Sequence, residues 1–103
     1  MTRTTREDLN DLCNRLTKLA FRCRQDRSIF ISVQYHGSTD GVEVSYSYPK
    51  DGEPIKSFTP VYLGGTHYSM TDSADKLLEI YTQLSRLHVE TLRAKDSGTG
   101  QLL

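Results

Sequence analysis

The segment from Leu63 to Met70 holds the residue types best suited to binding a ligand. It leads from a predicted strand into the start of a predicted helix, where free backbone N–H groups and the helix dipole favour an anion. The segment lacks the lysine and the glycine spacing of phosphate-binding loops, so a plain connection is the alternative. The candidate residues for a small anionic, nucleotide-like ligand are Gly64, Gly65, Thr66, His67 and Tyr68.

The histidines and cysteines do not form a catalytic or metal-binding pattern. His36, His67 and His88 fall in a turn, a loop and a helix, with no pair at a helical metal-binding spacing. His88 lies in an apolar stripe, which is typical of a histidine bonded to a neighbour in a core or an interface. Cys13 and Cys23 share one helix and lie too far apart along its axis to bridge, so we expect reduced thiols. We therefore expect no metal, no cofactor and, since no nucleophile motif is present, no enzyme activity.

A row of basic side chains on the first predicted helix gives an alternative function, nucleic-acid binding. Thirteen basic and thirteen acidic residues cancel, so only a local patch of this kind could hold an anionic partner. Basic residues near a helix C-terminus also stabilise the helix dipole, which is the simpler explanation of the row. The candidate residues are Arg15, Lys18, Arg22 and Arg27.

The first predicted helix begins around Thr4 and Thr5, which precede Glu7 and Asp8 at the spacing of a reciprocal cap. Apolar residues then recur at helical spacing as far as Cys23 and form one stripe. Phe21 projects off that stripe, so it is either tucked beneath a neighbouring turn or exposed.

Alternating residues predict three antiparallel strands, over 29–36, 42–48 and 55–63. The turns between them contain Asp40 and Gly52, residue types that accept unusual backbone angles. Pro60 removes a hydrogen-bond donor, so the third strand is expected at an edge or broken near this residue. The strand tyrosines share a face with valines and isoleucines, which favours the rim of a core over a stacking platform. These are Tyr35, Tyr46 and Tyr48.

The second helix is expected to be long, with caps among Thr71, Asp72 and Ser73. Its apolar stripe is wider than contact with one sheet requires, so we expect it to contact a further element or a second chain. A homodimer is the first interpretation. The candidate interface residues are Ile80, Leu84, Leu87 and Thr91.

The order of these elements predicts an α+β fold, α-β-β-β-α, with two helices packed on one face of a three-stranded antiparallel meander sheet. Residues 1–96 are expected to form a single domain, and residues 97–103 a flexible tail. We expect a cytoplasmic protein without a membrane partner, because no segment reads as a signal peptide or as a membrane span of about 18 apolar residues.

The order of elements resembles the double-stranded RNA-binding domain, which also has a glycine-bearing loop before its second helix. That family places basic residues at the start of this helix to hold phosphates. Here Asp72 and Asp75 accompany Lys76, and the two acidic residues would repel phosphates. RNA binding therefore stays the alternative.

The chain is also similar to small accessory proteins of phages and prophages. The similarity lies in the opening helix around residues 14–17, in short strands with tyrosines, and in the closing helix over residues 73–84. It implies an inhibitor or counter-defence protein that acts by occupying a host factor. The sequence thus predicts a non-enzymatic binding or regulatory protein, whose partner is a host protein or a small anionic ligand.

Overall fold

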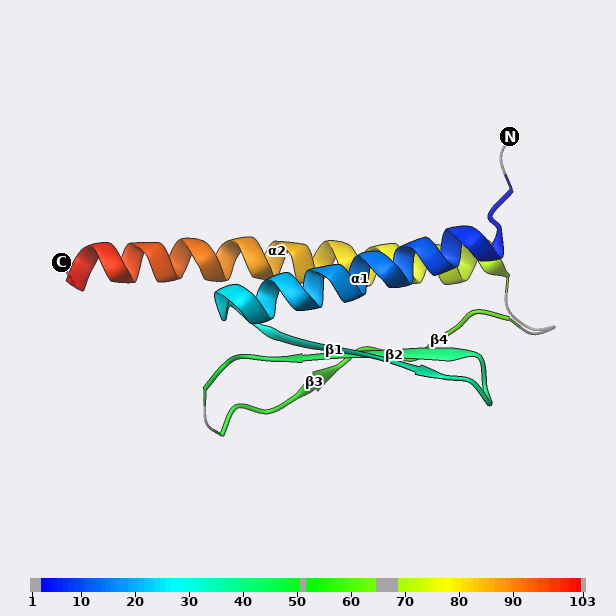
Figure 1. Ribbon diagram of the computed structural model, residues 1–103, viewed down its shortest axis with the longest axis horizontal. Coiled ribbons are helices and arrows are strands. Elements are labelled where there is room, and N and C mark those ends of the chain that lie inside the picture. The colour runs from blue at the N-terminus through cyan, green and yellow to red at the C-terminus, as the bar shows by residue number, and fades with distance from the viewer. Residues whose placement is uncertain (1–2, 51, 65–68, 103) are drawn as a thin grey trace.

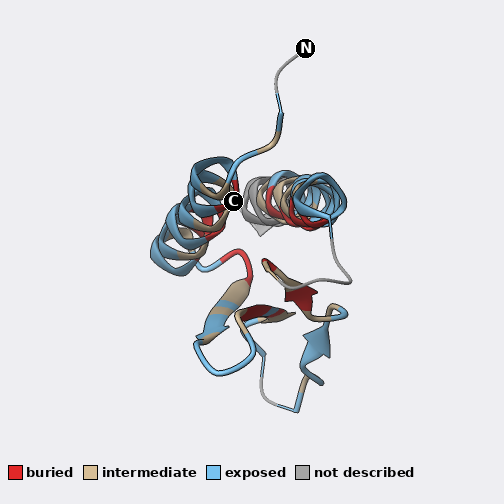
Figure 2. Cartoon of the chain, turned by 90° about the vertical axis from the view of Figure 1, so that its right-hand side faces the viewer, coloured by how far each residue is buried: buried red, intermediate tan, exposed pale blue. Residues whose placement is uncertain are grey.

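The computed structural model describes residues 3–50, 52–64 and 69–102, with side chains as far as Ala94. Its elements follow the order α1 (Arg6–Asp26), β1 (Phe30–His36), β2 (Gly41–Ser47), β3 (Lys56–Ser57), β4 (Val61–Tyr62) and α2 (Met70–Leu102). Both helices lie on one face of an antiparallel sheet (Figures 1 and 2). The predicted α+β fold is confirmed, with the third strand divided into β3 and β4.

Helix α1 begins and ends as its sequence dictates. The Thr5 hydroxyl accepts a hydrogen bond from the backbone N–H of Asp8 at 3.2 Å, and the Asp8 carboxylate accepts one from the backbone N–H of Thr5 at 2.8 Å. This reciprocal pair satisfies two N–H groups that the helix itself leaves unbonded. The helix ends at Asp26 and is capped by Arg27, whose left-handed conformation (φ 56°) turns the chain toward β1. Phe21 lies off the buried stripe and is 67% exposed. Of the two alternatives for this residue, tucked beneath a neighbouring turn or exposed, the second is therefore correct.

The β1–β2 hairpin places its apolar residues on one face. Val33 lies opposite Val44, and Tyr35 lies opposite Val42. Residues directly opposite in an antiparallel pair project to the same side of the sheet. The inward-facing apolar residues of the two strands therefore form one continuous apolar surface under the helices. Asp40 closes the hairpin with φ 53°, as its residue type predicted.

The third strand is interrupted, as Pro60 predicted. β3 and β4 both pair with β2, and Thr59 and Pro60 between them belong to neither strand. β2 is therefore the centre of the sheet, while β1 pairs with β2 alone among the described strands. The other side of β1 is an edge of the sheet.

Helix α2 starts at Met70, earlier than the sequence indicated. The Ser69 hydroxyl accepts the backbone N–H of Asp72 at 3.0 Å, so the expected caps at Thr71, Asp72 and Ser73 lie inside the helix instead. The Ser73 hydroxyl donates to the backbone oxygen of Tyr62, which ties the helix to β4. Helix α2 runs in the same direction as α1 and continues past its end (Figure 1).

The tail expected over residues 97–103 is helical as far as Leu102, and its flexibility stays a prediction. Within the described residues, neither helix combines the length and the apolar character needed to cross a membrane. The core lies between the helix pair and the sheet. Its buried apolar residues are Leu9, Leu16, Leu19, Cys23, Ile29, Val42, Val44, Val61, Leu63, Leu77, Ile80 and Leu84.

Candidate functional site

Most of the predicted ligand loop, residues 65–68, lies outside the described residues. Gly64 is described, and it lies against the carboxylate of Asp40. A Cβ atom at residue 64 would come within 2.7 Å of Asp40 Oδ2, which is closer than such atoms approach in proteins. The close approach of these two segments therefore accounts for glycine at position 64, and anion binding by the loop stays a prediction.

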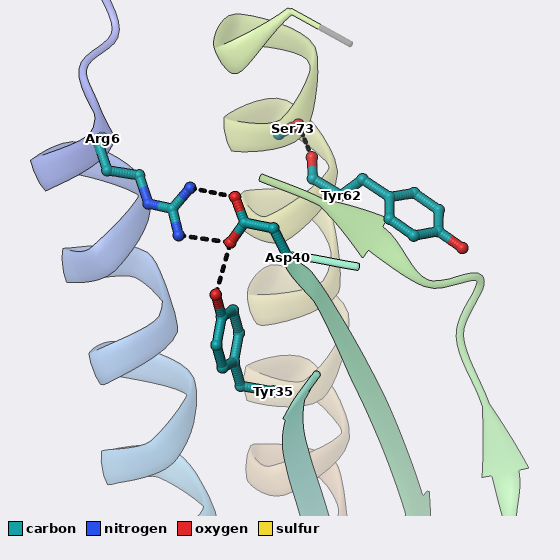
Figure 3. Close-up of polar contacts among 5 residues, drawn as sticks. All are labelled: Arg6, Tyr35, Asp40, Tyr62 and Ser73. Carbon is teal, nitrogen blue, oxygen red and sulfur yellow. Dashed lines mark hydrogen bonds and ion pairs between the residues drawn. The ribbon is translucent and has the colours of Figure 1, made fainter. Parts of the chain in front are cut away.

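Asp40 is the centre of a polar cluster that joins three elements (Figure 3). Arg6 from the first turn of α1 donates from Nη1 and Nη2 to its two carboxylate oxygens, each at 2.6 Å. The Tyr35 hydroxyl from β1 donates to Oδ1 at 2.7 Å. These donors lower the pKa of Asp40 to about 2, with the Arg6 hydrogen bonds as the largest cause. The hydrogen bond to Asp40 raises the pKa of Tyr35 above its ordinary value.

The cluster has the properties of a structural clamp. A carboxylate that is ionised at neutral pH and already accepts three hydrogen bonds is a poor proton acceptor for a substrate. The bidentate geometry instead fixes the start of α1 against the β1–β2 turn. We therefore assign Arg6, Tyr35 and Asp40 to the positioning of the elements.

His88 has the role that its place in the apolar stripe indicated. The side chain is buried, and its Nε2 lies 2.7 Å from Asp26 Oδ2 at the end of α1. Burial raises the pKa of Asp26, but hydrogen bonds from Ser28 and His88 outweigh this effect and leave it below the ordinary value. In the part of the chain that is described, no group of three or more metal-ligating side chains comes together.

Two of the four residues predicted for a dimer interface, Ile80 and Leu84, lie in the core of this chain, and the homodimer stays a prediction. Ile80 is 6% exposed and Leu84 is fully buried, both in the core of this chain. Leu87 packs against the same core, and Thr91 is half-buried. The apolar stripe of α2 is wide because the helix contacts both α1 and the sheet. Its extra width is therefore explained within one chain.

The basic residues proposed for nucleic acid are all exposed. Arg15, Lys18 and Arg22 lie on α1, and Arg27 follows as the residue that caps the helix. Arg24 points elsewhere, since its guanidinium lies 5.0 Å from the centre of the Phe30 ring. The structure thus groups three of the four predicted residues along one helix surface.

The sequence did not reveal a groove between α1 and β1. It consists of two adjoining cavities, of about 320 Å³ and 560 Å³, which share Thr17 and Val33. We call them together the α1–β1 groove. One cavity is lined by Thr17, Ala20, Phe21, Arg24, Phe30, Ile31 and Val33, and the other by Arg6, Asn10, Cys13, Asn14, Thr17, Val33, Tyr35, Val42 and Leu63.

The groove lies between α1 and β1, the edge strand, and its larger cavity also reaches Val42 of β2 and Leu63. Strand β1 has seven residues and contains no proline, lysine, aspartate or glutamate. Proteins commonly use such residues to prevent another strand from pairing with an exposed edge. The exposed Phe21 and the uncharged β1 are the two sequence signals that could have indicated this site, but only folding places them together.

Comparisons with known proteins give no independent indication of function. No protein-family model matches the chain, and the searches of curated proteins and of solved structures found no significant match.

Proposed function

We propose that this protein is a non-enzymatic binding protein that acts by occupying a protein partner. The observation that carries the proposal is the α1–β1 groove beside an unprotected strand edge. A concave surface of this kind, apolar in its smaller cavity and mixed in its larger one, is suited to recognition, because burying apolar area drives most protein association.

Two titratable groups, Asp40 and His88, already have side-chain partners within the chain, which also favours binding over catalysis. Asp40 is held by Arg6 and Tyr35, and His88 is paired with Asp26. A general acid or base must reach a substrate proton, and these groups contact each other in the interior or at element junctions.

The similarity to small phage accessory proteins suggests the finer form of the proposal, an inhibitor or counter-defence protein that blocks a host factor. Sequestration of a small anionic ligand by residues 64–68 is the other form of binding that we retain. A homodimer also remains part of the proposal, but its interface would have to use side chains other than Ile80 and Leu84.

The test is affinity capture with the full chain from host cells, followed by reconstitution with the purified partner. We expect one protein to form a complex of fixed stoichiometry on size-exclusion chromatography with light scattering. If the captured proteins form no such complex, occupancy of a protein partner is excluded. A substrate turned over by the purified chain would contradict the non-enzymatic assignment.

Nucleic-acid binding is the second candidate, and the exposed row of Arg15, Lys18 and Arg22 is the observation in its favour. Titration with duplex RNA and duplex DNA at two salt concentrations tests it. Contacts to phosphates release counterions, so genuine binding must weaken steeply with salt. Binding that is absent, or that does not change with salt, excludes this candidate.

A further inference from the structure

We propose that an extended segment of the partner protein pairs with the free edge of β1 as an additional strand and places alternate side chains in the α1–β1 groove. The inference rests on the proposed function and names the surface and the kind of partner. It depends on the backbone of β1, on the shape of the groove and on its charge.

The backbone of β1 is available for pairing. All seven of its residues pair with β2. In such a ladder, alternate residues direct their N–H and C=O groups away from the partner strand. On the other side of β1 no described strand receives these groups. An extended peptide placed there would satisfy them with main-chain hydrogen bonds, which provide affinity in strand addition whatever the peptide sequence.

The position of α1 creates a space for the side chains of that strand. Figure 2 shows α1, the helix at the left, extending outward beyond the strand beneath it. A strand added at about 4.8 Å from β1 would therefore lie beneath the outer side of α1. Alternate side chains of the peptide would contact Ala20, Phe21 and Ile31, which line the groove. Phe21, 67% exposed in the chain by itself, would become covered.

The charge of the groove specifies the peptide further. Among the described residues that line its two cavities there is no aspartate or glutamate. Of the two lining arginines, Arg6 is paired with Asp40, whereas Arg24 lies on the wall near Phe30. A neighbouring cavity at the same end is lined by Arg24, Arg27 and Lys50, with Glu53 as its one carboxylate among the described residues. The complementary peptide alternates apolar residues and carries an acidic residue at the end that lies near Phe30.

The same geometry argues against a second folded copy as the occupant. Two copies joined edge to edge through β1 would each bring α1 beyond the shared edge, and the two helices would overlap (Figure 2). A peptide segment without a covering helix avoids this collision. The expected occupant is therefore a loop or terminus of another protein.

The first test selects peptides from a random nonapeptide display library on the immobilised full chain. We expect alternating apolar residues with an aspartate or glutamate at one end. Amide hydrogen exchange of the chain with the best synthetic peptide should slow in β1 and remain unchanged in β3, the opposite side of the sheet. Selected peptides that lack alternation, or protection located outside β1, would overturn the proposal.

The second test blocks the groove with a matched pair of variants. Thr17 and Thr82 are both exposed helical threonines whose hydroxyls donate to the carbonyl four residues earlier, Cys13 and Leu78 respectively. Thr17 lines both cavities, whereas Thr82 lines neither. We expect Thr17→Trp to weaken binding of the selected peptide at least about tenfold and Thr82→Trp to leave it unchanged. Equal affinities for the two variants would overturn the proposal.

The third test reverses charge. Arg24→Glu should weaken the acidic peptide about tenfold, and a peptide with lysine in place of its acidic residue should regain affinity for this variant. Arg22→Glu makes the same change on an exposed residue outside the groove and should have little effect. Circular dichroism checks that each variant is folded. An Arg24→Glu variant that binds both peptides like the unchanged chain would remove the charge argument and the proposal with it.

The captured partner distinguishes the two proposals. If it binds Thr17→Trp and Arg24→Glu as tightly as the unchanged chain, strand addition is wrong while the binding function stands. If sedimentation shows a dimer that Thr17→Trp dissociates, the edge belongs to a second copy and the peptide proposal is overturned.

Discussion

At the level of single residues, a few charged side chains join the elements of this fold where they meet. Asp40 illustrates this, since it receives two hydrogen bonds from Arg6 and one from Tyr35. Charge-assisted, bidentate pairs are stronger than ordinary surface ion pairs, although solvent screens part of the attraction here. A conservative substitution of Asp40 should therefore lower the free energy of unfolding by a measurable amount.

Replacement of Asp40 by asparagine should lower stability by about 1 kcal/mol at neutral pH, because the charge that Arg6 and Tyr35 bind is lost. The measurement is urea unfolding followed by circular dichroism. The control is Asp75→Asn, which changes an exposed aspartate on α2. Equal stability of the two variants would show that the Arg6–Asp40 pair contributes nothing.

The same pair predicts a pH dependence. The pKa of Asp40 is about 2 in the folded chain, below the value of about 3.9 for an unfolded aspartate. The unfolded state then binds more protons, so this stabilisation is complete above about pH 4 and is lost as the pH falls toward 2. Unfolding measured between these pH values should show a shallower slope in Asp40→Asn than in the unchanged chain.

Gly64 gives a prediction that couples two residues. Gly64→Ala would force the Asp40 carboxylate away from the new Cβ atom and should cost about 1–3 kcal/mol. In an Asp40→Ala background the obstructing carboxylate is absent, so the same substitution should cost much less. A double-mutant cycle from denaturant unfolding measures the difference, and additive effects would contradict the contact.

At the scale of elements, the two helices are joined where α1 ends. His88 lies in the middle of α2, and its Nε2 reaches Asp26 in the last turn of α1 at 2.7 Å. The buried stripe of α2 packs beside this contact and also reaches the sheet through Ser73 and Tyr62. The parallel helices are therefore held together by apolar packing and, at the end of α1, by the contact between His88 and Asp26.

The contribution of the His88–Asp26 contact can be isolated with His88→Leu, Asp26→Asn and the double variant. We expect a coupling free energy of about 1 kcal/mol at neutral pH, because a partly buried charged acceptor loses its imidazole partner. The pKa of Asp26 is below its ordinary value, so its contribution is present above about pH 4 and declines in more acidic solution. A coupling free energy near zero at neutral pH would show that His88 contributes to stability through packing and not through this bond.

At the level of the whole molecule, the two parts of α2 differ in what they contact. The N-terminal part forms the core with α1 and the sheet, and the C-terminal part extends beyond the end of α1 (Figure 1). Among its described side chains, the buried ones are Ser73, Leu77, Ile80, Leu84 and His88. The stability of the domain should therefore come from the N-terminal part.

Deletion of residues 97–103 should leave the thermal unfolding midpoint nearly unchanged, because the described buried side chains of α2 all precede them. Leu84→Ala, in contrast, removes a fully buried side chain and should cost about 2–5 kcal/mol. Differential scanning calorimetry compares the two. A deletion as destabilising as Leu84→Ala would place essential packing in the last turns of α2.

The order of the elements could be predicted from the residues alone, because the information that specifies each element is local. The cap at Thr5, the two-residue alternation around Val44 and the break at Pro60 each follow from steric and hydrogen-bonding preferences of neighbouring residues. The same reasoning failed at the start of α2, where several hydroxylated residues compete to cap and the structure uses Ser69.

The neighbours of the apolar surfaces could not be predicted in this way and are known only from the folded chain. The stripe of α2 left open whether it contacts a further element or a second chain. The structure places α1 against it, and periodicity cannot identify a neighbour distant in sequence. The Arg6–Asp40 pair spans 34 positions, and the α1–β1 groove combines residues whose spacing carries no signal. Packing brings such residues together, which is why a surface for a partner could be located only after the chain was folded.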